Sequence, residues 1–201
     1  MLVYRPPAWP CFARARLCAD AFTLLELLVV LGLVGVAAAI ALPRFDRTRM
    51  NVDAQAVSVR GVLIMAQRAA VTRGEDVLVV FDTAGRLLRV QEDPNGNMAR
   101  DAGEQVTATV VEGDVVFDRG SAPALRVGQE TGVNFAGRQS GQPVLVFHRD
   151  GSASEAGVFY LTTKRSANGN YAADTRAFDV QRATGRAVAY RYDGSVWRRE
   201  L

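Results

Sequence analysis

A run of 21 mostly apolar residues near the start of the chain constrains everything that follows it. Residues 22–42 read FTLLELLVVLGLVGVAAAIAL, with one charge, Glu26, and one hydroxyl, Thr23. About 20 consecutive apolar residues are enough to cross the hydrocarbon core of a bilayer as a helix. A helix on the surface of a soluble domain would also show a polar face, which this run lacks. The sequence therefore predicts a transmembrane helix over residues 22–43.

Glu26 is the exception within this run. A carboxylate at the centre of a membrane helix costs about 2.5–3.5 kcal/mol, and less near the helix end. The residues alone allow two interpretations. Either the Glu26 side chain reaches the nearby membrane surface, or it pairs with a group that the run itself does not contain.

The residues on either side of Glu26 resemble the processing site of type IV prepilins and type II secretion pseudopilins. In that family a basic leader is cut just before a Phe, a Glu is the fifth residue of the mature chain, and a Pro follows the apolar run; here these are Phe22, Glu26 and Pro43. The resemblance implies that prepilin peptidase cuts between Ala21 and Phe22 and that the new Phe22 amine is methylated. Ala21 departs from the Gly that usually precedes the cut, although a small residue is retained.

The same resemblance implies how the subunit assembles and where it lies. Glu26 of one subunit would pair with the Phe22 amine of its neighbour, because an unpaired carboxylate is strongly penalised in an apolar bundle. Such contacts between pilin-like subunits run head to tail and give an open helical filament. The protein would span the inner membrane once, with its C-terminal head in the periplasm.

The leader, residues 1–21, carries Arg5, Arg14 and Arg16, which favours a cytoplasmic N-terminus. An ordinary secretory signal is the alternative, since Ala37-Ala38-Ala39 could serve as its cleavage site. That alternative leaves the Phe, Glu and Pro of the processing pattern unexplained.

Charge and cysteine content exclude several functions. Three arginines and one aspartate lie in the leader, so the chain from Phe22 onward carries 21 basic and 20 acidic side chains, against 24 and 21 in the whole sequence. The pI near 9.2 is therefore no argument for nucleic-acid binding. Both cysteines, Cys11 and Cys18, also belong to the leader. The mature chain would contain neither a disulfide framework nor a thiolate metal site.

Residues 44–74 are predicted to extend the helix as an amphipathic stalk. Six apolar residues recur at spacings of three and four, which places them on one helix face; they are Val52, Ala56, Val59, Leu63, Ala66 and Ala70. Gly74 is the expected stop. The helix would then run from residue 22 to residue 73, interrupted or kinked only by Pro43.

Residues 75–201 are predicted to form a periplasmic head rich in β-strands, because the apolar period changes to two and no helical period follows. Three hairpins are expected, formed by residues 76–81 with 86–91, 143–148 with 157–163, and 175–181 with 186–192. Further strands are expected at 105–111, 114–118, 123–128 and 131–135. The fold class is α+β: a long helix, half transmembrane and half stalk, packed on an antiparallel β-sheet head.

The head narrows the resemblance to the GspH/FimT branch of the superfamily. Phe147 followed by Asp150-Gly151-Ser152, and a last hairpin turning at Gly185-Arg186, are similar to that branch. The branch implies a minor pseudopilin of type II secretion, whose filament drives protein export across the outer membrane. The alternative is a FimT-like minor pilin of type IV pili, involved in pilus assembly and DNA uptake. A third alternative is a signal-anchored binding protein that never assembles.

Catalytic chemistry is not indicated in the head. His148 is the single histidine, at a strand end where a half-exposed structural role is expected, and no Ser/His/Asp triad can be built around it. Asp93, Asn95 and Asn97 have the alternate spacing of a calcium loop, but Gly96 is misplaced for an EF-hand, so a turn is favoured. We expect a protein that is not an enzyme and that uses no cofactor or metal.

The C-terminal segment carries the remaining candidate site. Five arginines there are candidate DNA-binding residues, namely Arg182, Arg186, Arg191, Arg198 and Arg199, and they alternate with Tyr190, Tyr192 and Trp197. Guanidinium groups bind phosphates and aromatic rings stack on bases. The alternative is an edge hairpin whose charges prevent pairing with other strands. Nucleic acid is accordingly the less favoured partner.

Overall fold

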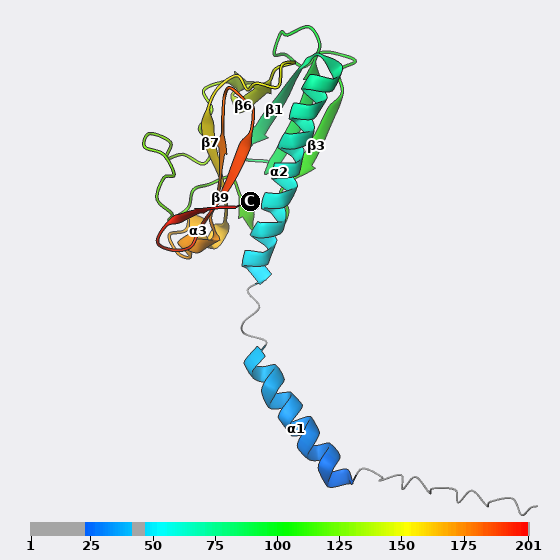
Figure 1. Cartoon of the computed structure of the whole chain (residues 1–201), viewed down its shortest axis with the longest axis vertical. Helices are drawn as coiled ribbons and strands as arrows, with labels where there is room; N and C mark the ends of the chain where they lie inside the picture. The colour runs from blue at the N-terminus through cyan, green and yellow to red at the C-terminus, as the bar shows by residue number, and fades with distance from the viewer. Residues whose placement is uncertain (1–22, 42–46, 201) are drawn as a thin grey trace, which may run out of the picture. The chain divides into compact units, whose positions relative to one another are not determined.

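The computed structural model describes residues 23–41 and 47–200 of the chain. The chain divides into two compact units, Met1–Phe45 and Asp46–Leu201, which we describe separately (Figure 1). Ala21, Phe22 and Pro43, which the sequence analysis assigned to processing and assembly, lie outside the described residues.

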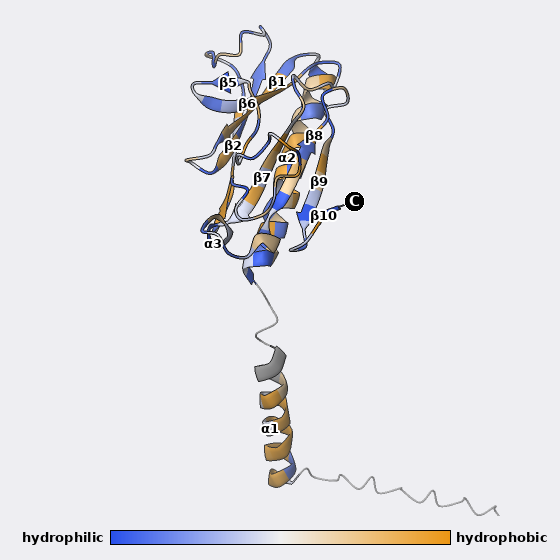
Figure 2. Cartoon of the chain, turned by 90° about the vertical axis from the view of Figure 1, so that its left-hand side faces the viewer, coloured by the Kyte–Doolittle hydropathy of each residue, from blue (hydrophilic) through white to orange (hydrophobic). Residues whose placement is uncertain are grey.

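The first unit contains one described helix, α1 (Leu24–Ala41). Thr23 begins it, because its Oγ1 accepts the backbone N–H of Glu26 at 3.1 Å. The helix is hydrophobic along nearly its whole length (Figure 2). Within residues 23–41 and 47–200, no helix combines the length and hydropathy needed to cross a membrane. The transmembrane helix over residues 22–43 extends beyond the described residues and stays a prediction.

The second unit begins with α2 (Arg47–Arg73). The buried residues of α2 are the six of the predicted stripe, which confirms that stripe. The helix ends where predicted: Gly74 adopts a left-handed φ of 73°, and the N–H groups of Gly74 and Glu75 both reach the carbonyl of Ala70. Because residues 42–46 are not described, the continuity of the helix from residue 22 to residue 73 stays a prediction.

Two antiparallel sheets of five strands form the head (Figure 1). The first has the order β3 (Val106–Val110), β2 (Leu87–Asp93), β1 (Asp76–Asp82), β6 (Gln142–Phe147) and β5 (Arg138–Gln139). The second has the order β10 (Trp197–Arg199), β9 (Ala187–Tyr192), β8 (Arg176–Val180), β7 (Gly157–Thr163) and β4 (Val115–Val116). The α+β class and the antiparallel head are thus as predicted, with two sheets.

The core lies where α2 meets the inner faces of both sheets. Its buried cluster combines the α2 stripe with apolar residues of β1 and β6 from the first sheet and β7 and β8 from the second. Aromatic rings join the two sheets. The ring centre of Phe81 in β1 lies 5.0 Å from that of Phe159 in β7. The Phe159 ring in turn stacks on that of Phe178 in β8, with 4.7 Å between the ring centres. The helix is therefore part of the core of the head and not a separate stalk beside it.

The first and third predicted hairpins are confirmed by the pairing of β1 with β2 and of β8 with β9. The second is wrong, because β6 pairs with β1 and β7 pairs with β8. The turn after Phe147 does form, with Gly151 donating to the carbonyl of His148 at 2.8 Å. Beyond Ala153 the chain crosses to the other sheet. Both segments are apolar on both faces, so their pattern did not specify which neighbours they would take.

Several local features also differ from the sequence prediction. Residues 123–128 form no strand, and within 131–135 only Val133 makes a bridge, to Phe159. Two short helices, α3 (Lys164–Ala167) and η2 (Ala172–Asp174), and the strands β5 and β10 were not predicted. Each spans four residues or fewer, which is too short for a hydrophobic period to register.

The two sides of α2 offer a matched pair of substitutions. Leu63→Ala should lower the free energy of unfolding of the unit 46–201 by about 2–5 kcal/mol, because Leu63 is buried among both sheets and its truncation leaves a cavity. Met65→Ala, two positions away and 70% exposed, should change it by less than about 0.5 kcal/mol. Urea unfolding followed by circular dichroism measures both. Equal effects would contradict the placement of α2.

Candidate functional site

Glu26 is the one predicted assembly residue that the structure describes. It lies in the first turn of α1, where its backbone N–H is capped by Thr23. Among the described residues, none of the ion pairs involves Glu26. The large apolar side chains of α1 are exposed, from 47% for Val30 to 76% for Leu24.

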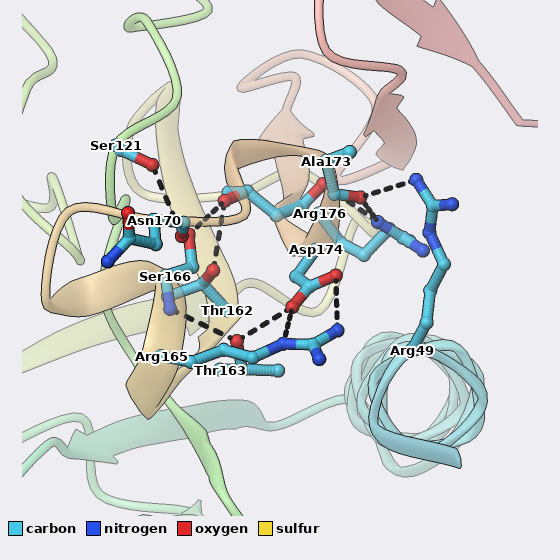
Figure 3. Close-up of polar contacts among 11 residues, drawn as sticks. Arg49, Ser121, Thr162, Thr163, Arg165, Ser166, Asn170, Ala173, Asp174 and Arg176 are labelled. Carbon is cyan, nitrogen blue, oxygen red and sulfur yellow. Dashed lines mark hydrogen bonds and ion pairs between the residues drawn. The ribbon is translucent and has the colours of Figure 1, made fainter. Parts of the chain in front are cut away.

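The junction between α2 and the head is fixed by a buried arginine (Figure 3). Arg176 begins β8 and is fully buried. Its Nε donates to Oδ1 of Asp53 on α2 at 2.7 Å, and its Nη1 donates to the carbonyls of Ala173 and Thr175, each at 3.0 Å. Arg49 of α2 donates to the same Ala173 carbonyl at 3.2 Å. Two turns of α2 are thereby bound to the segment that leads into the second sheet.

Burial lowers the pKa of the Arg176 guanidinium, and the nearby carboxylate of Asp53 opposes that shift. An arginine stays charged even so, because its ordinary pKa is far above physiological pH. Removing Asp53 would leave a positive charge in the interior without its counter-ion. Losing the counter-ion of a buried charge strongly destabilises the folded protein, whereas an exposed ion pair contributes little to its stability.

A second ion pair shapes the loop that supplies these carbonyls (Figure 3). Asp174 is buried and accepts Arg165 Nε at 2.6 Å, Arg165 Nη2 at 3.1 Å and the hydroxyl of Thr163 at 2.9 Å. The Arg165 guanidinium also lies 4.3 Å from the ring centre of Tyr171. These contacts hold α3 and η2 against the start of β8, so the Ala173 carbonyl points toward α2.

The other end of α2 is bound by Gln67. Its Nε2 donates to the carbonyl of Gly151 at 2.8 Å and to that of Thr184 at 2.6 Å, so one amide joins two turns of the head. Gly185 has a φ of 62°, and a Cβ there would lie 2.3 Å from the Gly151 carbonyl oxygen. The Gly185-Arg186 turn, which contains one of the five candidate DNA-binding arginines, therefore packs closely on α2.

The five tail arginines do not form one surface. Arg182 and Arg186 flank the turn between β8 and β9, while Arg191 and Arg198 lie directly opposite each other near the far end of β9 and on β10. Five residues of strand separate Arg186 from Arg191, or about 17 Å. Arg199 pairs across from Tyr190, which places it on the opposite face of the sheet from Arg198.

The aromatic residues of the tail lie on a different face of the sheet from Arg191 and Arg198. Tyr192 lies opposite Trp197, and their ring centres are 5.2 Å apart. Trp197 also lies 6.0 Å from Tyr160 and donates its Nε1–H to the carbonyl of Pro123 at 3.2 Å. These rings cover the outer face of the second sheet. Alternation along the strands puts Arg191 and Arg198 on the other face, next to Arg176.

Turn chemistry accounts for the other polar motifs. Asp193 accepts N–H groups from Val196 and Ser195 and the Nε of Arg198, which hold the pKa of its carboxyl well below the ordinary value. Asp93 accepts the N–H groups of Asn97 at 3.1 Å and Met98 at 2.8 Å, as expected for a turn. Within residues 23–41 and 47–200, no cluster of His, Cys, Asp or Glu could hold a metal ion.

His148 has the half-exposed structural position that was expected. Its Nδ1 lies 2.9 Å from Oδ2 of Asp76, and its side chain is 40% exposed. The sequence analysis did not find Arg176, Asp53 or Gln67. One signal existed for Arg176: it stands at the start of the buried strand Arg176–Val180, where a charged residue needs a partner. Nothing in the sequence identified Asp53 as that partner.

These features define the class of protein. The polar groups bind α2 to the head, the buried ion pairs are structural, and the described helix α1 is almost wholly apolar in sequence. Such a molecule is a structural subunit that carries a head on a helix.

Comparison with known proteins gives the family. Residues 55–184 match the model for the family "Type II transport protein GspH", so the chain belongs to that family, and it is a pilin-like structural subunit and not an enzyme. The chain is 41% identical over 90 residues to the pilin-like protein PilA1 of Thermus thermophilus, a match that covers 43% of this chain and 56% of the relative's length. A solved structure, the minor pseudopilin EpsH of the Vibrio cholerae type 2 secretion system, aligns at 13% identity with a TM-score of 0.43, covering 77% of this chain and 97% of EpsH.

The Asp53–Arg176 pair gives a second prediction. Asp53→Asn should lower the free energy of unfolding by about 1–3 kcal/mol, less than the 3–5 kcal/mol of a fully buried pair, because Asp53 is partly exposed. Asp114→Asn is the matched control: its pair with Lys164 spans 3.9 Å between exposed side chains, so the change should stay within about 0.5 kcal/mol. Urea unfolding compares them, and indistinguishable variants would contradict a role for the pair in the junction.

Proposed function

We propose that this protein is a minor pseudopilin of the type II secretion system, a subunit of the short filament that drives protein export across the outer membrane. The observation that carries the proposal is the family match, because it spans residues 55–184 and so includes most of α2 and of the head. The geometry suits a filament subunit whose helix and head move as one body, since α2 is bound to the head at Asp53 and again at Gln67.

The N-terminal segment supplies the assembly step of this proposal. Prepilin peptidase would remove residues 1–21, and the segment 22–43 would anchor the chain in the inner membrane with the head in the periplasm. Glu26 would then pair with the methylated Phe22 amine of the neighbouring pilin-like subunit. The apolar sequence of α1, with Glu26 as its one charged residue, supports this arrangement. The pairing sets the stagger between subunits, because a buried carboxylate without a cation is costly.

A minor pilin of type IV pili is the second candidate function. The partial match to a pilin-like protein of Thermus thermophilus favours it. The DNA binding that this candidate would add rests on the tail arginines, which lie at two separate places on the second sheet. A duplex would therefore meet either Arg182 with Arg186 or Arg191 with Arg198, and not all five arginines at once.

Glu26→Gln tests the assembly step, since glutamine keeps the shape of the side chain and removes its charge. The variant should be processed and inserted like the natural protein but should co-purify poorly with other pilin-like subunits after cross-linking in cells. Mass spectrometry of the variant provides the control, because a chain that begins at Phe22 confirms processing. Undiminished cross-linking would show that Glu26 only reaches the membrane surface.

Salt-dependent DNA binding separates the two candidate functions. If the head captures duplex DNA through three or four phosphates that include those at Arg182 and Arg186, the slope of log affinity against log salt should be about −3 to −4, and Arg182→Ala with Arg186→Ala should remove about two units. Thermal stability should change little, because exposed charges contribute little to folding. Fluorescence anisotropy of labelled duplex measures the slope. For a secretion subunit we expect no submicromolar binding of duplex DNA at about 0.15 M salt. Submicromolar binding under these conditions would favour the type IV pilus function instead.

A further inference from the structure

The edges of the two sheets differ in how well they are protected. An edge strand presents unpaired N–H and C=O groups to other chains, and proteins usually protect such an edge by keeping it very short or charged. Three of the four edges in the described head are protected in this way. β4 and β5 have two residues each, and β10 has three, of which two are arginines. β3 is the exception, because its five residues read VTATV and include neither a charge nor a proline.

The pairing of β3 with β2 shows which backbone groups of β3 are free. In an antiparallel pair, residues that exchange hydrogen bonds with the neighbouring strand alternate with residues whose groups point away from it. Val111, directly after β3, donates its N–H to the carbonyl of Arg86 at 2.8 Å, so the odd-numbered residues face β2. The groups of Val106, Ala108 and Val110 therefore point outward, and none of their N–H or C=O groups is bonded within the described part of the chain. Three donors and three acceptors are available to another strand.

The surface beside this edge indicates what kind of strand fits. Thr107 and Thr109 point to the face that α2 covers, where they line a recess of about 190 Å³ between α2 and β2. The aliphatic residues of the recess are Val62, Met65, Ala66, Ala69 and Val90. Its two charged residues, Arg73 and Glu92, form an ion pair with each other. A strand added at β3 would place every second side chain beside this neutral recess, which favours uncharged apolar side chains at those positions.

A second copy of the chain does not suit this edge. Antiparallel pairing of β3 with β3 of another copy would place a twofold axis perpendicular to the sheet. α2 belongs to the same compact unit as the sheet and lies along its strands (Figure 1). The twofold axis would therefore make the two α2 helices run in opposite directions. On the proposed function both helices lead away from the same membrane, so they run in the same direction and the pairing is excluded.

We propose that β3 docks an extended segment of a different protein, which adds one antiparallel strand to the first sheet. The paired part of this segment is uncharged and carries apolar side chains at every second position, beside the recess. Backbone hydrogen bonds to the outward groups of β3 provide the binding, and the recess selects the side chains. The inference goes beyond the proposed function and uses it only to exclude a second copy.

The test uses the full chain in lipid nanodiscs and two labelled synthetic peptides of identical sequence. Their core has threonine at the first, third and fifth positions and isoleucine at the second and fourth. When the isoleucine side chains lie beside the recess, the threonine N–H groups face β3. One peptide is N-methylated at both isoleucines and its twin at two threonines. Fluorescence anisotropy should show the first binding at least about tenfold more tightly, because the twin lacks N–H groups toward β3.

Matched variants at one position assign the binding to the β3 edge. Ala108→Pro removes an outward N–H without breaking a bond to β2, and it should weaken the first peptide at least about tenfold. Ala108→Val keeps that N–H and should leave the affinity within about twofold. Melting curves show whether both variants are folded.

Hydrogen exchange in the natural chain locates the peptide without any substitution. Bound peptide should slow exchange of the Ala108 amide at least about tenfold. The Arg199 amide points outward from the charged edge strand β10, and its exchange should not change. This measurement keeps the proposal testable if Ala108→Pro does not fold.

Equal binding of the two methylated peptides, or binding of neither, would overturn the proposal. So would a dimer of the chain in analytical ultracentrifugation that Ala108→Pro abolishes, because a second copy would then occupy the edge. The Glu26→Gln experiment is independent of these. Defective assembly of that variant with no peptide preference would refute the docking edge alone, and intact assembly with a clear preference would refute the filament role of Glu26 alone.

Discussion

The burial of one stripe of α2 between two sheets is the interaction on which the rest of this structure depends. The stripe consists of small and medium apolar residues, and both sheets contribute side chains to the same cluster. Burying a Val or Leu side chain contributes about 1.5–3 kcal/mol. With three larger residues and three alanines over about five turns, the helix supplies the surface that joins the sheets. Aromatic contacts such as Phe81 with Phe159 complete that surface. Without the helix the inner faces of the head would be exposed to water.

Polar contacts then fix the position of α2 along that surface. Apolar packing is non-directional, so it leaves the rotation and sliding of a helix weakly specified. Arg176 with Asp53 near the start of α2, and Gln67 with two turn carbonyls further along, each require one particular alignment. A displacement of the helix would break them and leave buried groups without partners, which is costly. The head is thereby held in one fixed position on α2.

The same arrangement divides the surface of the molecule into distinct parts. The aromatic residues at the end of the chain cover the outer face of the second sheet, while Arg191 and Arg198 lie on the α2 side. One face of α2 enters the core and the opposite face, around Val57, is left apolar and flanked by arginines.

Local periodicity let the sequence by itself determine much of this protein. The stripe of α2, its end at Gly74, and the hairpins β1–β2 and β8–β9 follow from residue spacing and turn chemistry that act within a few residues. The processing pattern around Phe22 is also local, and it stays a prediction. Only the tertiary structure decided that β6 and β7 enter different sheets, that Arg176 meets Asp53 across 123 positions, and that Arg191 and Arg198 lie on the opposite face from the tail rings. These features depend on which distant surfaces are available to cover an apolar face or neutralise a buried charge. The residues of a single segment do not specify those distant surfaces.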